Sequence, residues 1–419
     1  MKTKKKQLLK LATVLFALSI TIGIISCKKD DNEVKTIALS TLMADDVDLN
    51  GATSPNNVAA NAVITATFTS DVDAATATTA NITLVRGYDN ATIPLTINTS
   101  GKTVTITLSE NLASGALHTL TLKAGIKSTN GAALTDQIAR TFTTEGFFAP
   151  AGMMAYWNFE DNAEDQVGTM DANAAIDITY AAGRKATAGK AASFNGTTSI
   201  IEILNGDQLM TDDFTFSFWI KATNTDHPQG HFVVGLGAFY GFQFEIGGDN
   251  IKFPTAYYYS NNTDSTFSED HWWNGDGKTK DNGGWQGTTV NKLVEGGPPT
   301  LVLENWVQII FRYNSDTKVS TLFLNGEKAL EQDFNLWNTS DKQKRATGLH
   351  YRGVEPDVYN DLAFGFVQSR RGTMWDNEPW GGYDQPTANH FKGLLDDVRA
   401  FNIALSDEEI TLMYNSEKP

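Results

Sequence analysis

The run FTFSFWI at residues 214–220 alternates large apolar side chains with smaller or polar ones over most of its length. A period of two is typical of a β-strand, because successive side chains point to opposite faces of the sheet. The runs MAYWNF at 154–159 and VSTLFL at 319–324 have the same pattern. Asn325 and Gly326 follow the last run and are a preferred pair for a tight hairpin turn. This part of the chain is therefore predicted to form antiparallel β-sheet.

The one convincing helix signal lies close to the last strand-like runs. Ser406 precedes the segment DEEITLMY at 407–414, and a serine at this position can accept a hydrogen bond from the first free backbone N–H groups of a helix. We therefore predict a single capped helix after a long series of strands.

Residues 36–146 have a different composition. They are rich in Thr, Ala and Asn, whereas all nine tryptophans of the chain lie after Phe147. Short runs that alternate Val, Ile or Leu with Thr lie at 63–68, 81–85, 102–108 and 118–122. Half-buried strands at this spacing favour a β-sandwich. With Pro150 marking a linker, the fold class is predicted to be all-β, with one sandwich over 36–146 and a second over 150–419.

The overall charge excludes one class of partner. The 419 residues include 33 Lys and Arg against 49 Asp and Glu, a formal net charge of −16. Such an acidic surface repels phosphate backbones, so no nucleic-acid partner is expected. Cys27 is the single cysteine, which excludes an internal disulfide bond and a cysteine-based metal site.

The N-terminal segment has the features of an export signal. Residues 1–26 carry basic side chains followed by an apolar stretch that is interrupted by polar residues. The sequence IISC at 24–27 resembles a lipobox, which implies lipidation of Cys27 and a membrane anchor made of several acyl chains. Residues 27–35 are then a flexible tether. Its segment KKDDNE resembles the tag that sends lipoproteins to the cell surface, so we expect an outer-membrane lipoprotein that faces the cell exterior.

The first predicted sandwich resembles a known family. The segments that carry the resemblance are ATFTSDVD at 66–73, SENLA at 109–113 and TFTT at 141–144. They are similar to the bacterial Ig-like domains of surface-layer proteins. The resemblance implies a spacer that lifts a functional domain away from the membrane.

The second predicted sandwich resembles the LamG-like, concanavalin A-like jelly roll. The matching motifs are AYWNFED at 155–161, GKAASFNG at 189–196, DFTFSFWIK at 213–221, NWVQ at 305–308, LFLNGE at 322–327 and FKGLLDDVRAFN at 391–402. The resemblance implies that the first and last strands pair as neighbours. Inserts near 224–300 and 366–390 lie outside the family pattern.

The same resemblance implies a structural calcium ion. The matching acidic positions are Glu160, Asp161, Asp165, Asp396 and Asp397. Calcium binds six to eight oxygen ligands, and carboxylates brought together from distant strands would otherwise repel one another. The alternative is that the acidic pair accepts hydrogen bonds from backbone amides at the end of a strand.

Candidate ligand-binding residues lie in two segments that are rich in Trp, Gly, Asn and Asp, and they are Tyr258, Trp272, Trp273, Trp285, Arg371, Trp375, Trp380 and Tyr383. Exposed aromatic rings offer flat apolar faces to sugar rings, while neighbouring polar groups bind hydroxyls. The alternative is that these rings pack their loops against the sandwich. Trp157, Trp219 and Trp306 lie in or beside strand patterns and are predicted to be core residues.

Catalytic signatures are missing from the sequence. A glycoside hydrolase needs two carboxyl groups on either side of one bond, and residues 150–419 lack the Glu-x-Asp-x-(x)-Glu pattern of the glucanases with this fold. They also lack a Gly-x-Ser-x-Gly motif. We therefore expect a non-enzymatic, lipid-anchored surface protein that binds a poly- or oligosaccharide. The alternatives are an adhesin or structural protein with a protein or cell-wall partner and, less favoured, a glycoside hydrolase.

Overall fold

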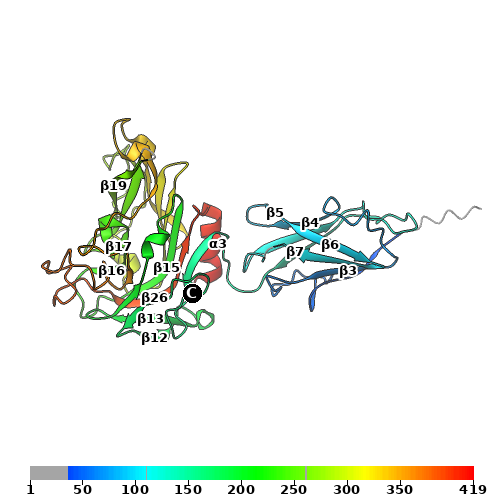
Figure 1. The fold of residues 1–419 in the computed structure, drawn as a ribbon, viewed down its shortest axis with the longest axis horizontal. Helices are drawn as coiled ribbons and strands as arrows, with labels where there is room; N and C mark the ends of the chain where they lie inside the picture. The colour runs from blue at the N-terminus through cyan, green and yellow to red at the C-terminus, as the bar shows by residue number, and fades with distance from the viewer. Residues whose placement is uncertain (1–35, 110, 260–261) are drawn as a thin grey trace, which may run out of the picture.

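The computed structural model describes residues 36–109, 111–259 and 262–419. The predicted signal peptide, Cys27 and the tether lie outside these residues. Among the described residues, nearly all regular structure is β-strand, and the paired strands form antiparallel sheets (Figure 1). The predicted all-β fold class is therefore confirmed.

The first sandwich consists of short strands from residue 39 onward. These are β1 (Leu39–Ala44), β2 (Val47–Asp48), β3 (Ile64–Phe68), β4 (Ile82–Arg86), β5 (Thr92–Ile93), β6 (Leu95–Ser100), β7 (Thr103–Leu108), β8 (Leu117–Leu122) and β9 (Ile138–Thr143). In the described part of this segment, one sheet has the order β2-β1-β3-β7-β6 and the other the order β5-β4-β8-β9. Ile64 and Ile106 from the first sheet share one buried core with Leu84 and Leu120 from the second.

The four alternating runs predicted in this segment form β3, β4, β7 and β8. Their apolar side chains face the core because every second residue of a strand points to the same face.

Two larger sheets form the second sandwich. The first contains β10 (Met153–Trp157), β12 (Thr179–Ala182), β13 (Lys190–Asn195), β15 (Phe214–Ala222), β20 (Thr288–Asn291), β21 (Val307–Asn314), β22 (Val319–Leu324), β23 (Glu327–Asp333) and β26 (Lys392–Phe401). The second contains β11 (Ala174–Ile176), β14 (Ile200–Ile203), β16 (His231–Gly235), β17 (Gln243–Ile246), β18 (Ile251–Tyr259), β19 (Asn262–Trp273), β24 (Ala346–Leu349) and β25 (Leu362–Phe364).

Strand β26 is a central strand of its sheet. It pairs with β13 on one side and β15 on the other, and β10 also pairs with it. The predicted pairing of the first and last strands of this sandwich is therefore confirmed. The core between the sheets contains Trp157, which is fully buried.

Trp219 is also buried, as predicted, and its indole N–H donates to Glu417. Trp306 differs from the prediction because it is only half-buried and lies just before β21.

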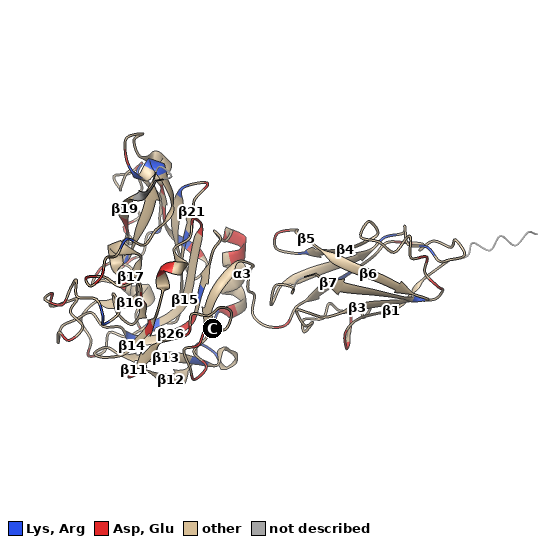
Figure 2. Ribbon diagram, viewed as in Figure 1, with Lys and Arg blue, Asp and Glu red and all other residues tan. Residues whose placement is uncertain are grey.

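The predicted turn and helix are both present. Asn325 and Gly326 have positive φ angles of 52° and 76° and connect β22 to β23. Helix α3 (Asp407–Glu417) begins after Ser406, whose hydroxyl accepts a hydrogen bond from the backbone N–H of Glu409. Acidic residues fill its first turn, where they complement the helix dipole (Figure 2). The other α-helix among the described residues is α2 (Pro299–Val302).

An apolar cluster lies between the two sandwiches. It includes Tyr88 of the first sandwich, Phe148 of the linker, and Ile410 and Met413 of α3. The rings of Tyr88 and Phe148 meet edge to face, with their centroids 4.9 Å apart. Among the described residues, neither helix has the length and apolar character needed to cross a membrane.

Candidate functional site

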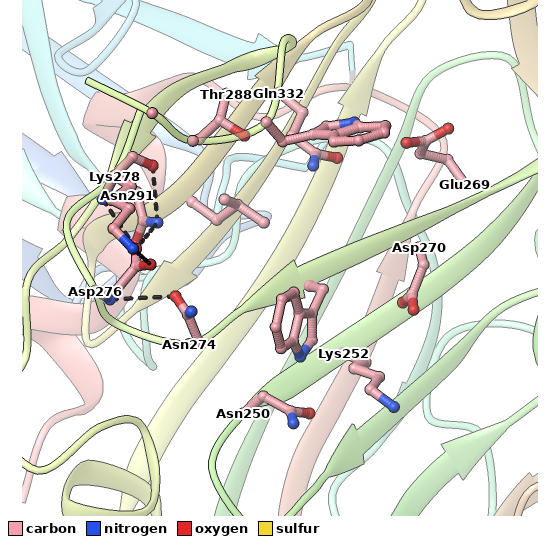
Figure 3. Close-up of a pocket in the computed structure, with 15 residues that line it drawn as sticks. Asn250, Lys252, Glu269, Asp270, Asn274, Asp276, Lys278, Thr288, Asn291 and Gln332 are labelled. Carbon is pink, nitrogen blue, oxygen red and sulfur yellow. Dashed lines mark hydrogen bonds and ion pairs between the residues drawn. The ribbon is translucent and has the colours of Figure 1, made fainter. Parts of the chain in front are cut away.

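The main pocket lies at one edge of the second sandwich. Strand β19 is the last strand of one sheet, and β20 is the last strand of the other. The loop 274–287 connects the two strands across this edge. Between them is a pocket with a volume of about 750 Å³ (Figure 3). Most of the residues that line this pocket belong to the insert near 224–300, which falls outside the jelly-roll pattern.

The end of β19 places one tryptophan in the pocket and the next one in the core. Trp272 is 47% exposed and lines the pocket, whereas Trp273 is fully buried. The indole N–H of Trp273 donates to the carbonyl of Lys292 at 3.2 Å. The prediction that Trp273 contacts a ligand therefore does not fit the structure, because adjacent residues of a strand face opposite sides.

The second pocket tryptophan comes from the connecting loop. Trp285 is 59% exposed, and it contributes to the pocket wall together with Trp272. The loop is held in place by polar contacts: the side-chain amide of Asn291 donates to Asp276 at 2.9 Å and to the carbonyl of Lys278 at 3.0 Å. The pocket therefore combines two exposed aromatic rings with a loop that is hydrogen-bonded to the sandwich.

One residue of the inner wall of the pocket is part of a buried polar network. Gln332 of β23 lines the pocket, and its side-chain oxygen contacts Nδ1 of His271. The other ring nitrogen of His271 contacts the hydroxyl of Tyr257 at 2.6 Å. Burial lowers the pKa of His271 to about 4, so the imidazole is neutral at neutral pH. This network fixes the position of Gln332 without a buried charge.

Carboxyl groups line one side of the pocket. Figure 3 shows Glu269 and Asp270 on one side, and Asp276 with its hydrogen-bonded neighbours on the other. Burial raises the pKa of Asp270 to about 6, with Glu245 acting in the same direction and Lys252 opposing it. Burial also raises the pKa of Glu269, although a hydrogen bond from Gln343 acts in the opposite direction.

Three buried acceptor oxygens of the lining residues have no hydrogen-bond partner within the described part of the chain. They are Oδ1 of Asn250, Asp270 and Asn291. The amide groups of the two asparagines are oriented by their own donated bonds, to Asp249 and to Asp276 respectively. Buried polar atoms are normally paired, so these oxygens are available to donors on a ligand or on water.

Sequence reasoning missed most of these polar lining residues. Asn250, Thr288, Asn291 and Gln332 carry no motif, and three separate strands or turns bring them together. Asp270 could have been found, since it lies two residues before Trp272 and shares its face of β19.

The other predicted ligand-binding residues lie outside this pocket. The ring of Tyr258 stacks on His350, with 3.5 Å between centroids. Arg371 pairs with Asp361 at 3.1 Å and lies over the ring of Tyr359. These contacts give each of the two predicted residues a partner within the protein.

The remaining three aromatic residues lie in the segment 375–383, outside the pocket of Trp272, and this segment is the second aromatic surface. The rings of Trp375 and Trp380 are 6.4 Å apart, and Trp380 is 41% exposed. The hydroxyl of Tyr383 donates to the carbonyl of Thr198. The structure therefore places two of the predicted residues in the pocket, one in the core and three in this second segment, while Tyr258 and Arg371 lie elsewhere.

Asp396 and Asp397, the acidic pair predicted to bind calcium, both form ion pairs with an arginine. Arg184 contacts Asp396 at 2.7 Å and Asp397 at 2.6 Å, and its side chain is fully buried. Arg399 pairs with Asp397 at 3.4 Å and also with Glu417 of α3. Burial and the neighbouring Asp397 raise the pKa of Asp396, whereas the two arginines outweigh burial at Asp397 and keep its pKa low.

The other three predicted calcium ligands also have protein partners. Glu160 accepts a bond from the backbone N–H of Lys190 at 3.1 Å, and Asp161 pairs with the Lys190 amine at 2.6 Å. Asp165 accepts bonds from three backbone amides, including that of Tyr156 at 3.0 Å.

Among the described residues, no group of three or more His, Cys, Asp or Glu side chains is arranged to hold a metal ion. The five predicted ligands therefore do not fit a calcium ion in this arrangement, because a guanidinium group already lies between the central pair.

Three of the solved structures that resemble this chain are distant in sequence. The binding domain of Paraclostridial Mosquitocidal Protein 1 is 16% identical, with a TM-score of 0.39, over 63% of this chain and 52% of that one. The botulinum neurotoxin serotype D ligand-binding domain in complex with N-acetylneuraminic acid is 13% identical, with a TM-score of 0.39, over 64% and 51%. Domain 4 of AbnA, a GH43 arabinanase from Geobacillus stearothermophilus in complex with arabinotriose, is 17% identical, with a TM-score of 0.34, over 64% and 100%.

The chain thus spans about half the length of the first of these structures, and at such identities and TM-scores the likeness assigns no function. A search of curated proteins returns no match. The family comparison is more specific, and it concerns the first sandwich: residues 47–144 match the model described as the bacterial Ig-like domain.

Proposed function

We propose that this protein binds a poly- or oligosaccharide in the pocket that contains Trp272 and Trp285. The observation that carries the proposal is the exposure of both indole rings, 47% and 59%, in a single pocket of about 750 Å³. Large apolar side chains are usually withdrawn from water, and an exposed pair at a concave site is typical of a binding surface. The flat faces of the rings suit the C–H faces of sugars.

The polar groups of the pocket support the same ligand class. A sugar hydroxyl both donates and accepts hydrogen bonds, and the free oxygens of Asn250, Asp270 and Asn291 require donors. A purely apolar ligand would leave these oxygens buried and unpaired, at a cost of about 1–3 kcal/mol each. A ligand rich in hydroxyl groups satisfies them while its carbon faces contact the tryptophans.

The proposal includes the position of the protein in the cell. Lipidation of Cys27 would anchor the chain to the outer membrane, and the Ig-like sandwich would act as a spacer for the second sandwich. Replacement of Cys27 by Ala is expected to abolish incorporation of labelled fatty acid and to release the protein from membranes. Shaving of intact cells with a protease then tests exposure: degradation of the second sandwich supports the outward-facing location.

The binding test is affinity electrophoresis of the full chain in gels that contain a panel of polysaccharides. Trp272→Ala and Trp285→Ala are expected to weaken retention by one polysaccharide at least about 30-fold, since truncation of a central aromatic contact costs about 2 kcal/mol or more. Trp380→Ala is the matched control because it removes an exposed tryptophan outside the pocket. Melting temperatures of all variants report whether the fold is intact.

Two outcomes would contradict the proposal. Retention that survives both pocket substitutions would place the binding site elsewhere, and loss with Trp380→Ala alone would place it on the second aromatic surface. If the panel gives no retention, a protein or cell-wall partner becomes the better interpretation. The proposal is for binding without catalysis, and release of new reducing ends from the retained polysaccharide would overturn that part.

A further inference from the structure

The cations that line the pocket are already paired with acids. Lys252 contacts Glu245 at 3.2 Å, and Lys278 contacts Asp276 at 3.4 Å. Among the described residues, these two lysines are the only basic side chains of the lining. An incoming anion would therefore have to compete with a protein carboxylate for either of them.

Two further carboxyl groups of the lining form no ion pair within the part of the chain that the structure describes. Among the described residues, neither Glu269 nor Asp270 lies within ion-pair distance of a basic side chain. Glu269 accepts a hydrogen bond from Gln343 at 2.9 Å, whereas Oδ1 of Asp270 is buried and has no partner. The excess charge of the pocket is therefore negative, and Asp270 is the group with unused hydrogen-bonding capacity.

The unpaired hydrogen-bonding atoms of the pocket disfavour an anionic ligand, as its negative charge does. The buried oxygens without partners belong to Asn250, Asp270 and Asn291, and all three are acceptors. Hydroxyl groups donate to such atoms, whereas carboxylate and sulfate groups only accept at neutral pH. An anionic sugar would bring a like charge and further acceptors to a site that needs donors.

We propose that the pocket selects neutral sugar units through their hydroxyl donors and rejects uronate, sialate and sulfated sugars, with Asp270 as the residue that sets this selectivity. The inference rests on the proposed function and adds the chemical class of the ligand. Asp270 lies two residues before Trp272 on the same face of β19, so its carboxyl group is placed beside a sugar that stacks on that ring.

The test compares one polysaccharide in two forms. The probe is the neutral polymer that the panel identifies, and its partner is the same polymer after partial oxidation of primary hydroxyls to carboxylates. The full chain is expected to bind the oxidised form at least tenfold more weakly at low salt. Asp270→Asn is expected to narrow this difference severalfold and to weaken binding of the neutral form, because the amide removes the charge and one acceptor. Asp384→Asn, an exposed acid outside the pocket, controls for the change in net charge.

A second measurement does not depend on a variant. The charged groups that interact with Asp270 are Lys252 of the neighbouring strand β18, Glu245 of β17, and Glu269, which is adjacent to it on β19. At pH 5 Asp270 is mostly protonated, whereas the carboxylates of the oxidised polymer remain charged. The discrimination of the unmodified protein against the oxidised form is therefore expected to fall between pH 8 and pH 5.

The outcomes separate this inference from the function on which it rests. Equal binding of both forms, still lost with Trp272→Ala, would overturn the selectivity and leave the sugar-binding pocket in place. Preferential binding of the oxidised form would do the same. A panel in which only anionic polysaccharides are retained would also overturn the selectivity. A panel in which no polysaccharide is retained would overturn the proposed function together with the inference.

Discussion

Arg184 offers the sharpest test of how the second sandwich is held together. Its side chain is fully buried, and the two acids that it contacts are 1% and 7% exposed. Arg184→Ala would leave Asp396 and Asp397 in the interior without this cation. Removing one partner of a buried ion pair costs about 3–5 kcal/mol. Here Asp396 would lose its ion-pair partner, whereas Asp397 would keep Arg399. A domain of this size loses about 2–4 °C per kcal/mol, so the expected fall in melting temperature is roughly 6–20 °C.

The assay is thermal unfolding of the full chain followed by circular dichroism. Lys190→Ala is the matched control because it breaks an exposed ion pair with Asp161. The side chains of Lys190 and Asp161 are 44% and 67% exposed. Such surface pairs contribute about 1 kcal/mol or less. A fall for Arg184→Ala no larger than that for Lys190→Ala would refute the reasoning. A lower melting temperature of the unmodified protein in chelator would show that a bound metal ion contributes to its stability, which the ion pairs of these acids do not predict.

Three further predictions concern stability. Trp273→Ala is expected to lower the free energy of unfolding in urea by about 3–5 kcal/mol, since its indole is fully buried; a loss below 1 kcal/mol would contradict the core position. Burial raises the pKa of Asp270 to about 6 from the ordinary 3.8, so its ionisation opposes folding above pH 6, and this cost disappears as the pH falls toward 4. The free energy of unfolding of Asp270→Asn, relative to that of the unmodified protein, should therefore rise between pH 4 and pH 6, by at most about 3 kcal/mol. If urea titrations show the same difference between the two proteins at both pH values, this linkage is excluded. Ser406→Ala should cost about 1 kcal/mol through the lost cap to Glu409, whereas an unchanged urea midpoint would show that the cap does not contribute.

Local sequence patterns predicted several strands, one hairpin turn and the C-terminal helix. The alternation in 214–220 depends only on the period of a strand, and the turn at Asn325 and Gly326 depends only on the φ angles that these residues accept. The cap at Ser406 is likewise decided within four residues. Such features need no knowledge of distant parts of the chain.

The candidate site was predicted only in part, because its details depend on contacts between distant residues. The sequence placed Trp272 and Trp273 together, but only the register of β19 decides which ring is exposed. The acids near residue 396 matched a calcium pattern, but the cation that contacts both of them is Arg184, which is 212 positions from Asp396 in the chain. A short motif contains no information about such a partner.

The position of β26 has a consequence for how the second sandwich folds. This strand occupies the middle of its sheet, yet β10, β13 and β15, its partners, all precede it by about 170 residues or more. During synthesis these three strands exist before β26 can join them, so their backbone edges stay open for a long time. Folding that depends on such distant pairings is slow, and open strand edges favour aggregation. We therefore expect this sheet to be completed only after β26 has been synthesised, because β26 lies between β13 and β15.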